Sequence, residues 1–453
     1  MSTAAARERW MDALGATDAA ALCGTLAGRM REAGITFGGR LLCSVLRPFF
    51  IAAADESRVA RAAETLAAVG ERTAHAALEW PELLDELGPT PEELRLVRID
   101  PGYRTVSTAS RADAFLLPGS LQFAEYNAES PGGPGYSHRL ADVFGATAVM
   151  AHVRESFDVR RHLTIDRLLE ALLASYREWG GRESPPRMAI VDWREVPTWS
   201  EFELLRDAFV AAGVPTLIAD PRDLTFDGTH LVAGGRSIDL VFRRVLVSDI
   251  VSRPSECRAL VDAYERRAVC VANTLRCKLP QKKTLFAVLT DERFDRLLEG
   301  GERELIRAHV PWTRRVKDDA STRDGRTIDL LEHARANRDQ LVLKPSDDYG
   351  GSGVQLGWEM SAGQWDTALG AALAERERVW VLQERIAVLR EPFPVCETDG
   401  VRERDMLVDL APYLFRGKLA GYLTRLSATG LANVTSGGEQ VPSFVVDVRG
   451  AGL

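Results

Sequence analysis

Apolar residues recur every three or four positions over two stretches near the start of the chain. Residues 16–34 and 57–80 follow this spacing, and the first stretch ends at Gly34. Such spacing predicts amphipathic helices, and a glycine just after the last apolar position is a common helix stop. Residues 1–95 are therefore predicted to form an N-terminal helical region.

A different pattern begins near residue 96. Residues 111–127 hold two short apolar runs with Pro118 and Gly119 between them, which predicts a β-hairpin. A polar loop rich in glycine and proline follows directly. We therefore treat residues 96–150 as a separate segment.

Apolar runs of strand length alternate with an amphipathic stretch after Pro186. The runs RMAIVDW, VPTLIAD and SIDLVFRRV are predicted as strands, and EFELLRDAFVAAG as a helix that ends at Gly213. This alternation indicates a parallel sheet with crossover helices. It predicts an α/β domain over residues 151–271.

The last segment, residues 272–453, is predicted to be rich in strands. Residues 340–358 run strand, glycine-rich turn, strand, and WVLQERI is another apolar strand. YLFRGKLAGYLTRLS indicates two strands that turn at Gly417. The predicted fold class of the whole chain is α/β (α+β).

Charge and cysteine content narrow the function classes. A net charge of −8 over 453 residues argues against a general nucleic-acid binder, which needs clustered Lys and Arg. The N-terminus has no apolar signal core, and no apolar run reaches about eighteen residues, the length of a membrane span. Six dispersed cysteines without a C-x-x-C pair indicate buried thiols in a reducing compartment, hence a cytoplasmic protein, and they lack zinc-ligand spacing.

A lysine and a glycine-rich loop form the first candidate site. Lys344 ends an apolar strand, and Gly350, Gly351 and Gly353 follow in the turn. Glycine N–H groups can cradle a phosphate at close range, and a lysine supplies a point charge to its oxygens. The P-loop pattern is absent, and an ordinary hairpin turn is the alternative interpretation.

The second candidate site lies on the predicted hairpin and combines Arg111, Asp113, Glu125 and Asn127. Glu125 and Asn127 are two residues apart on one strand, so their side chains share a face. Two carboxylates and an amide oxygen make the hard, oxygen-rich site that Mg²⁺ prefers. A solvated strand face with salt bridges is the alternative interpretation.

Two weaker signals lie further along the chain. Gln383, Glu384 and Ile386 stand at the end of the strand WVLQERI, where free backbone groups could bind an adenine edge or could simply end the strand. Arg425 follows an apolar strand, and Asn433 lies in a polar loop. A guanidinium can stabilise the charge that develops in phosphoryl transfer. A surface arginine and a turn asparagine are the alternative.

Together these segments resemble the circularly permuted ATP-grasp proteins, the group that includes relatives of glutathionylspermidine synthetase. The resemblance runs from about Gly34 to the C-terminus and rests on RADAFLLPGSLQFAEYNAESPGGPGY, SIDLVFRRV, LRCKLPQKKTLFAVLTDE, LVLKPSDDYGGSGVQLGWE, WVLQERI and LTRLSATGLANVTSGG. In an ordinary ATP-grasp chain the Asp…Glu-x-Asn motif comes last. Here it precedes Lys344 and the glycine loop, as a permutation would place it.

The resemblance implies a fold, ligands and residue roles. The fold would be a circularly permuted ATP-grasp, with 96–150 as its metal-binding segment, 151–271 as a pre-ATP-grasp-like domain and 272–453 as the nucleotide-binding lobe with the rest of the catalytic lobe. The implied contacts are Lys283, Lys344, Gly350, Gly351 and Gly353 to the ATP phosphates, Gln383, Glu384 and Ile386 to adenine, Asp113, Glu125 and Asn127 to Mg²⁺, and Arg111, Arg425 and Asn433 around the γ-phosphate. Lys282, next to Lys283, leaves the choice between these two lysines open.

The implied activity is an ATP-dependent carboxylate–amine ligase that works through an acylphosphate and releases ADP and phosphate. An ATP-grasp phosphotransferase and an ATP-binding accessory or scaffold protein without turnover are the alternatives. The substrates would be small molecules such as an amino acid, a peptide or a polyamine, and a homo-oligomer stays open. Candidate substrate contacts are Asp192, Arg194, Glu201, Arg243, Arg244 and the loop 130–136.

Overall fold

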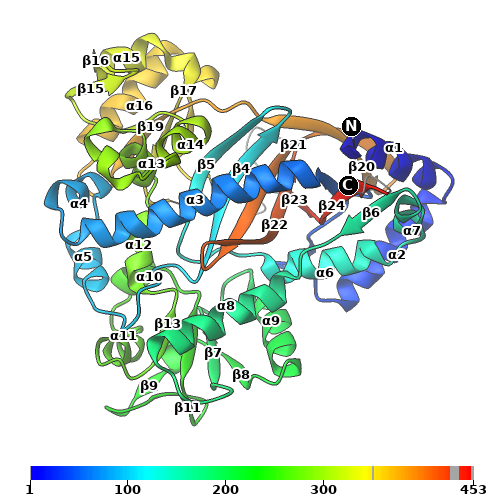
Figure 1. Cartoon of the computed structure of the whole chain (residues 1–453), viewed down its shortest axis with the longest axis horizontal. Helices are drawn as coiled ribbons and strands as arrows, with labels where there is room; N and C mark the ends of the chain where they lie inside the picture. The colour runs from blue at the N-terminus through cyan, green and yellow to red at the C-terminus, as the bar shows by residue number, and fades with distance from the viewer. Residues whose placement is uncertain (1, 349–350, 429–437, 450–453) are drawn as a thin grey trace.

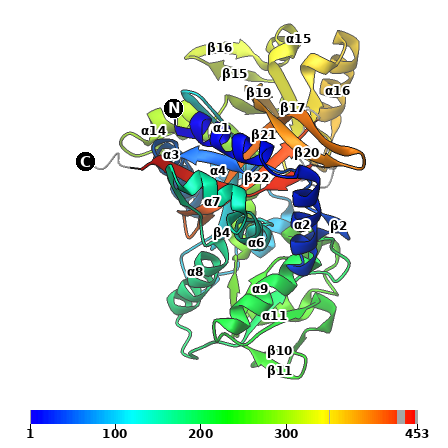
Figure 2. The ribbon, with the colours of Figure 1, turned by 90° about the vertical axis from the view of Figure 1, so that its right-hand side faces the viewer.

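The computed structural model describes residues 2–348, 351–428 and 438–449. Figure 1 shows a central sheet with a lobe of helices and strands at the upper left and an α/β lobe below. Figure 2 gives the same arrangement from the side, with these two lobes at opposite ends of the molecule. The long helix α3 (Ala53–Ala77) crosses the front of the central sheet.

The helical periodicity near the start of the chain is confirmed. The helices there are α1 (Ser2–Gly15), α2 (Ala19–Glu32), α3, α4 (Pro81–Leu87) and α5 (Pro91–Val97). Helix α3 buries Val59, Ala63 and Leu66 at helical spacing, and it packs against the central sheet. The same region also contains the short strands β1 (Thr36–Phe37), β2 (Arg40–Leu41) and β3 (Phe49–Ala52).

The central sheet joins segments from the two ends of the chain. Its strands are β4 (Ala109–Leu117), β5 (Ser120–Asn127), β20 (Leu389–Glu397), β21 (Gly400–Phe415), β22 (Lys418–Ser427) and β23 (Glu439–Val441). The order is β23-β22-β21-β4-β5, with β20 paired to β21, and every pairing is antiparallel. The predicted hairpin is therefore present as β4–β5. It pairs with a hairpin that lies about three hundred residues later in the chain, and Arg111 is opposite Tyr413 in this pairing.

The lower lobe confirms the predicted parallel sheet. Its elements are α8 (Thr164–Trp179), β7 (Met188–Val191), α9 (Trp199–Ala211), β8 (Thr216–Ala219), η1 (Pro221–Asp223), β9 (Thr225–Phe226), β10 (Leu231–Ala233), β11 (Arg236–Ile238), β12 (Leu240–Arg243), α10 (Val247–Ser252), α11 (Arg258–Glu265) and β13 (Cys270–Ala272). The parallel strands run in the order β13-β12-β7-β8. The run predicted as one strand, SIDLVFRRV, is divided at Asp239, and its first part belongs to the antiparallel sheet β9-β10-β11.

The upper lobe contains an antiparallel sheet in the order β14-β19-β17-β18. Its elements are α13 (Thr284–Leu289), η3 (Glu292–Leu297), α14 (Glu302–His309), β14 (Thr313–Arg315), β15 (Ala320–Arg323), β16 (Arg326–Asp329), α15 (Leu330–Ala336), η4 (Arg338–Gln340), β17 (Leu341–Pro345), β18 (Gln355–Leu356), η5 (Gly357–Glu359), α16 (Ala362–Ala374) and β19 (Trp380–Glu384). The preceding η2 (Leu275–Cys277) and α12 (Lys278–Gln281) pack against α5 and α3. Strands β17 and β18 flank the predicted glycine-rich turn, and β19 is the predicted strand WVLQERI.

A small sheet connects the early and late parts of the chain. Strand β24 (Ser443–Val448) lies between β3, which it pairs with in parallel, and β6 (Phe157–Arg160), which it pairs with in antiparallel fashion. The helices α6 (Pro134–Gly145) and α7 (Ala148–Arg154) lie between the hairpin and β6 in the chain. Helix α1 packs against both α7 and β24, so the first helix and the last strand lie side by side.

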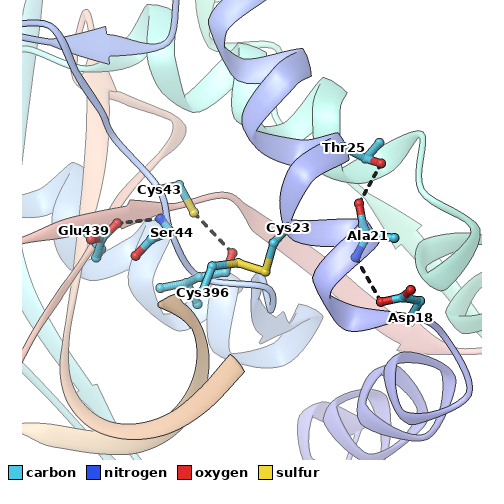
Figure 3. The surroundings of a disulfide bond; sticks show 9 residues. Asp18, Ala21, Cys23, Thr25, Cys43, Ser44, Cys396 and Glu439 are labelled. Carbon is cyan, nitrogen blue, oxygen red and sulfur yellow. Dashed lines mark hydrogen bonds between the residues drawn. A yellow bond between two sulfur atoms is a disulfide. The ribbon is translucent and has the colours of Figure 1, made fainter. Parts of the chain in front are cut away.

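A disulfide overturns the expectation that all six cysteines are thiols. Cys23 on α2 and Cys396 on β20 are bonded across 373 residues of sequence, as Figure 3 shows. Cys43, Cys257, Cys270 and Cys277 are free and buried. Burial raises the pKa of Cys257 to about 12, which keeps this thiol protonated and unreactive. The spacing of cysteines along the chain gave no sign of the pair, because it forms only when α2 packs beside β20.

No helix among the described residues is long and apolar enough to cross a membrane. In the same part of the chain, no group of three or more His, Cys, Asp or Glu side chains is placed to hold a metal ion. A metal site built from two carboxylates, an amide and phosphate oxygens does not need such a group.

Gly421 on β22 is held in a conformation that other residues rarely adopt. Its φ is +141°, and a Cβ atom there would lie 2.5 Å from Thr164 Cγ2 and 2.9 Å from His162 Cβ. We expect Gly421→Ala to lower the free energy of unfolding by about 1–3 kcal/mol, through backbone strain and overpacking together. Chemical denaturation followed by circular dichroism measures the change.

Gly363→Ala is the matched control for Gly421→Ala. Gly363 lies in α16, and a Cβ atom there meets no atom within 4 Å. Alanine in a helix is expected to leave the free energy of unfolding unchanged or to raise it by about 0.5–1 kcal/mol. Equal losses in the two variants would contradict the strain at Gly421.

Candidate functional site

A cavity of about 320 Å³ lies between the upper lobe and the central sheet. It gathers predicted site residues from the early hairpin and from several segments of the last third of the chain. Those that line it are Asp113, Glu125, Lys283, Lys344, Gly351, Gln383, Glu384, Ile386 and Arg425. Gly350 and Asn433 lie outside the described residues. We call this space the first cavity.

Lys344 is a buried ammonium group without a carboxylate partner. The residue lies on β17 and is 7% exposed, and its Nζ donates to Ala124 O at 3.2 Å. Among the described residues no Asp or Glu oxygen lies within ion-pair distance of this nitrogen. Burial lowers the pKa of Lys344 to about 8, and Glu125 opposes the shift only in part. The group is therefore placed to receive an anion from the cavity.

The structure distinguishes the two adjacent lysines that the sequence left open. Lys283 lines the first cavity, where its Nζ lies 3.3 Å from Glu125 Oε2 and donates to Asp348 O at 2.5 Å. Lys282 turns away from the cavity, and its Nζ lies 2.9 Å from Glu93 and 3.1 Å from Asp347. Lys283 alone of the pair faces the space next to Lys344.

The base of the glycine-rich turn is fixed by ion pairs. Asp347, two residues after β17, accepts from Lys278 at 2.6 Å and from Lys282 at 3.1 Å. Burial alone would raise the pKa of Asp347, but the two lysines outweigh it and hold the pKa well below its usual range. Gly353 packs so closely that a Cβ atom there would lie 2.7 Å from Pro345 Cγ. Gly353 does not itself line the cavity.

The residues expected to contact adenine lie at the end of β19. Gln383 is buried and its Nε2 donates to Thr313 Oγ1 at 3.2 Å, while Glu384 is paired with Arg323. Ile386 lines the first cavity together with Val342 and other apolar side chains, namely Leu356, Trp358, Val388 and Leu407. These side chains make this part of the cavity apolar, and such an apolar slot suits an aromatic base.

The residues expected to bind Mg²⁺ face one another across the hairpin. Asp113 on β4 is directly opposite Glu125 on β5, and Arg111 is opposite Asn127. Asn127 Nδ2 donates to Glu125 Oε1 at 3.1 Å. Asp113 and Glu125 line the first cavity, whereas Asn127 lines a second cavity next to it.

Asp113 also belongs to a cluster of four charged side chains that line the two cavities. Arg111 Nε donates to Asp113 Oδ1 at 2.8 Å, and Arg425 Nε donates to Asp409 Oδ2 at 2.6 Å. Arg425 also pairs with Asp113, so the four side chains form one chain of ion pairs. Burial alone would raise the pKa of Asp113, but Arg111 and Arg425 outweigh it and hold the pKa well below its usual range.

Asp409 is a member of this cluster that the sequence interpretation missed. It lies on β21, and burial raises its pKa to about 7 against the opposing charge of Arg425, with Asp113 adding to the rise. Its sequence signal is an aspartate inside the apolar run MLVDLAPYLF. Such a charge inside a buried strand requires a partner, and this fact alone could have marked it.

A second cavity of about 350 Å³ adjoins the first, and Glu125 and Arg425 line both. Arg111, Asn127, Asp192 and Arg244 also line the second cavity, together with the start of the loop after the hairpin and Tyr136. The other candidate substrate contacts lie elsewhere. Arg194 pairs with Asp223 at 2.5 Å, Glu201 accepts from Gly133 N at 2.8 Å, and Arg243 pairs with Glu129 at 3.1 Å.

The family Circularly permuted ATP-grasp type 2 matches residues 117–434, which is most of the chain. The chain belongs to this family. The circularly permuted ATP-grasp fold explains why the early hairpin β4–β5 completes a sheet built mainly from late strands. The predicted family resemblance and fold class are thereby confirmed.

Comparisons with individual proteins agree with the family. A protein of Frankia alni provisionally named glutamate–cysteine ligase 2-3 is 27% identical over 191 residues, which are 40% of this chain and 20% of that protein. A protein of Frankia casuarinae provisionally named glutamate–cysteine ligase 2-2 is 23% identical over 254 residues, 52% of this chain and 27% of that protein. The chain thus matches only about a fifth to a quarter of the length of these relatives.

A solved structure shows the same fold along almost the whole chain. The glutathione synthetase-like effector of Globodera pallida, in its apo form, superposes with a TM-score of 0.56 over 97% of this chain and 96% of that one. The two sequences are 12% identical, so the likeness concerns the fold alone.

The lowered pKa of Lys344 predicts a pH dependence of nucleotide binding. Below about pH 8 the ammonium is present, and above it the group loses the charge that attracts phosphate. We expect the affinity for ATP to fall by up to about tenfold per pH unit above pH 8. Titration of a fluorescent ATP analogue between pH 6.5 and 9.5 measures this change in affinity. In Lys344→Arg, whose guanidinium stays charged, this fall should disappear, and its persistence would contradict the assignment.

The adjacent lysines give a matched pair of variants. Lys283→Met removes a charge from the first cavity, and we expect it to weaken ATP binding about 10-fold or more. Lys282→Met leaves Glu93 and Asp347 short of a partner, so we expect it chiefly to lower the free energy of unfolding. Nucleotide titration and denaturation on both variants separate these effects. Equal losses of ATP affinity would contradict the difference in placement.

Proposed function

We propose that the protein is an ATP-dependent ligase that joins a carboxylate to an amine with release of ADP and phosphate. The observation that carries the proposal is Lys344, a buried ammonium with no carboxylate partner in the part of the chain that the structure describes, in a cavity that also holds Lys283, Asp113 and Glu125. Burying an unpaired charge is costly, so such a group is retained where a ligand completes it. Membership of the ATP-grasp family and the ligase names of the Frankia relatives support the same conclusion.

In this proposal ATP lies in the first cavity in one orientation. The apolar slot beside Ile386 accepts the adenine ring, and the end lined by Lys283 and Lys344 accepts the phosphates. In this proposal the backbone N–H of Gly351, which lines the same cavity, donates to a phosphate oxygen. Gly350 belongs to the same proposed contact through its place in the sequence.

The side chains at the phosphate end have the chemistry that Mg²⁺ needs. Asp113 and Glu125 point toward the cavity from adjacent strands, and Asn127 is two residues beyond Glu125. Carboxylate oxygens can accept several contacts at once, so the arginine bonds of Asp113 leave lone pairs for a metal. We assign Asp113, Glu125 and Asn127 as the Mg²⁺ ligands, and the bound ion would neutralise charge on the β- and γ-phosphates.

The proposed reaction proceeds in two steps. A carboxylate oxygen of the first substrate attacks the γ-phosphorus of ATP, the bond to the bridging oxygen breaks, and ADP leaves. Arg425 lines both cavities with Arg111 beside it, so the pair can stabilise the negative charge that develops on the transferred group. The amine of the second substrate then attacks the acyl carbon of the acylphosphate, phosphate leaves, and a proton passes to solvent. Asn433 is assigned to the same end by its place in the motif.

Turnover with defined substrates tests the function. The protein is incubated with Mg·ATP and pools of amino acids, small peptides and polyamines, while phosphate release and product masses are followed. We expect ADP and a product lighter than its two substrates by one water. Glu125→Gln and Lys344→Met should each lower turnover about 100-fold or more, because the first removes the charge of a proposed Mg²⁺ ligand and the second removes the ammonium that meets the phosphates. Lys418→Met, on an exposed lysine paired with Glu64, is the control and should keep full activity.

Other outcomes of this experiment identify the alternatives. A stable phosphorylated substrate would indicate a phosphotransferase. Binding of ATP that depends on Lys344, without turnover in any pool, would favour an accessory protein. Absence of ATP binding altogether would overturn the proposal.

A further inference from the structure

The second cavity opens at the crevice of the parallel sheet. The sheet order β13-β12-β7-β8 departs from chain order, because the chain adds β8 on one side of β7 and β12 on the other. The order therefore reverses between β7 and β12, and ligands of open α/β sheets bind at the carboxyl ends of strands at such a point. Asp192 follows β7 and Arg244 follows β12 at this position, and both line the cavity.

Asp192 is a buried carboxylate that can accept further hydrogen bonds. It is 7% exposed, and among the described residues its side chain accepts one hydrogen bond, from Trp193 N to Oδ1 at 2.8 Å. No Lys, Arg or His of the described chain lies within ion-pair distance of it. Burial raises the pKa of Asp192 to about 6, although Arg244 opposes the shift. A cationic group bound in the cavity would form the ion pair that Asp192 lacks among the described residues.

Arg244 is the complementary group beside it. It is 6% exposed, and among the described residues its guanidinium donates one hydrogen bond, from Nη1 to Pro131 O at 2.7 Å, while Nε has no partner. Phe202 and Phe242 hold the guanidinium in place, each with its ring centre 5.5 Å away. The adjacent Arg243 is different, because it pairs with Glu129 and is fully buried.

We propose that the second cavity binds the head group of a free α-amino acid, with Asp192 receiving the α-ammonium and Arg244 the α-carboxylate. The proposal rests on the ligase function above and names its first substrate class. Neither charge has an ion pair among the described residues, and one zwitterionic head group would supply a partner to both. A dicarboxylate without nitrogen would leave Asp192 unpaired, and a polyamine would place its charge against Arg244.

The head-group contacts determine which part of the amino acid reacts. When the α-ammonium and the α-carboxylate are both held, the reacting group must belong to the side chain. The border with the first cavity is lined by Arg425 and Glu125, with Arg111 next to it in the second cavity. When Glu125 binds Mg²⁺, as the proposed function has it, the two arginines and the ion make this end favour an anion. The substrate is therefore an amino acid with an acidic side chain. That side-chain carboxylate attacks the γ-phosphorus in the first step, and the new amide bond forms on the side chain.

Matched donor molecules test the head-group contacts. L-glutamate and L-aspartate carry both head-group charges, glutarate and succinate lack the ammonium, and 4-aminobutyrate and β-alanine lack the α-carboxylate. Hydroxylamine serves as the amine, because it converts any acylphosphate to a hydroxamate whatever the natural acceptor is. We expect kcat/KM for an acidic amino acid to exceed that of its truncated analogues about 10- to 100-fold. Calorimetric titration of the same compounds in the presence of a non-hydrolysable ATP analogue measures binding without turnover.

Variants at the two positions should change selectivity rather than activity alone. Asp192→Asn is expected to weaken binding of the acidic amino acid about 10-fold or more and to leave binding of glutarate or succinate unaffected. Arg244→Gln is expected to weaken binding of the acidic amino acid by a similar factor and to leave binding of 4-aminobutyrate or β-alanine unaffected. Binding of the ATP analogue should not change in either. Arg194→Gln and Asp223→Asn are the controls, since these residues form an exposed ion pair in the same lobe outside the cavity.

The outcomes separate this inference from the proposed function. Equal losses for all donors in both variants would mean that the two residues only support the fold, and the inference would be wrong. Turnover of other donors, with no binding of acidic amino acids, would overturn the inference and leave the ligase intact. Absence of ATP binding would overturn the ligase, and titration with the amino acid alone would then decide whether Asp192 and Arg244 form the site.

Discussion

The fold of this protein depends on burying two carboxylates and two guanidinium groups together. Arg111 and Asp113 come from β4, Asp409 from β21 and Arg425 from β22, and their side chains are between 2% and 13% exposed. Loss of one partner would leave a buried charge uncompensated, which costs several kcal/mol, about 3–5 in measured cases. The early hairpin must therefore dock beside the late one, because only that pairing completes the set.

The two cavities meet beside this cluster, at its member Arg425 and at the neighbouring Glu125. Arg425 and Glu125 face both, so a group bound on one side meets a group bound on the other at these residues. The nucleotide side is built on the antiparallel strands of the upper lobe, and the substrate side on the ends of parallel strands in the lower lobe. A sheet that joins these lobes holds the reacting groups in register, which matters because small misplacements are costly in catalysis.

Local patterns in the sequence were sufficient for much of this arrangement. The turn at Pro118 and Gly119, the alternation after Pro186 and the lysine before the glycine loop each depend on neighbours in the chain, and the structure has all three elements. The features that could not be predicted from the sequence depend on contacts between distant segments. Lys282 and Lys283 are equivalent in sequence and differ only in what packs beside them, and Arg243 and Arg244 repeat the case. The Cys23–Cys396 bond has the same origin.

The placement of β24 between β3 and β6 makes the ends of this fold neighbours. The disulfide already closes a covalent loop of 373 residues, and α1 packs directly on β24. A short linker from β24 to α1 would complete a ring in which no segment is first or last. Opening that ring between β6 and α8 would yield a chain in the ordinary ATP-grasp order, with the same core and a different beginning. Circularly permuted and ordinary ATP-grasp chains then differ in where the chain begins and ends within the same arrangement of elements.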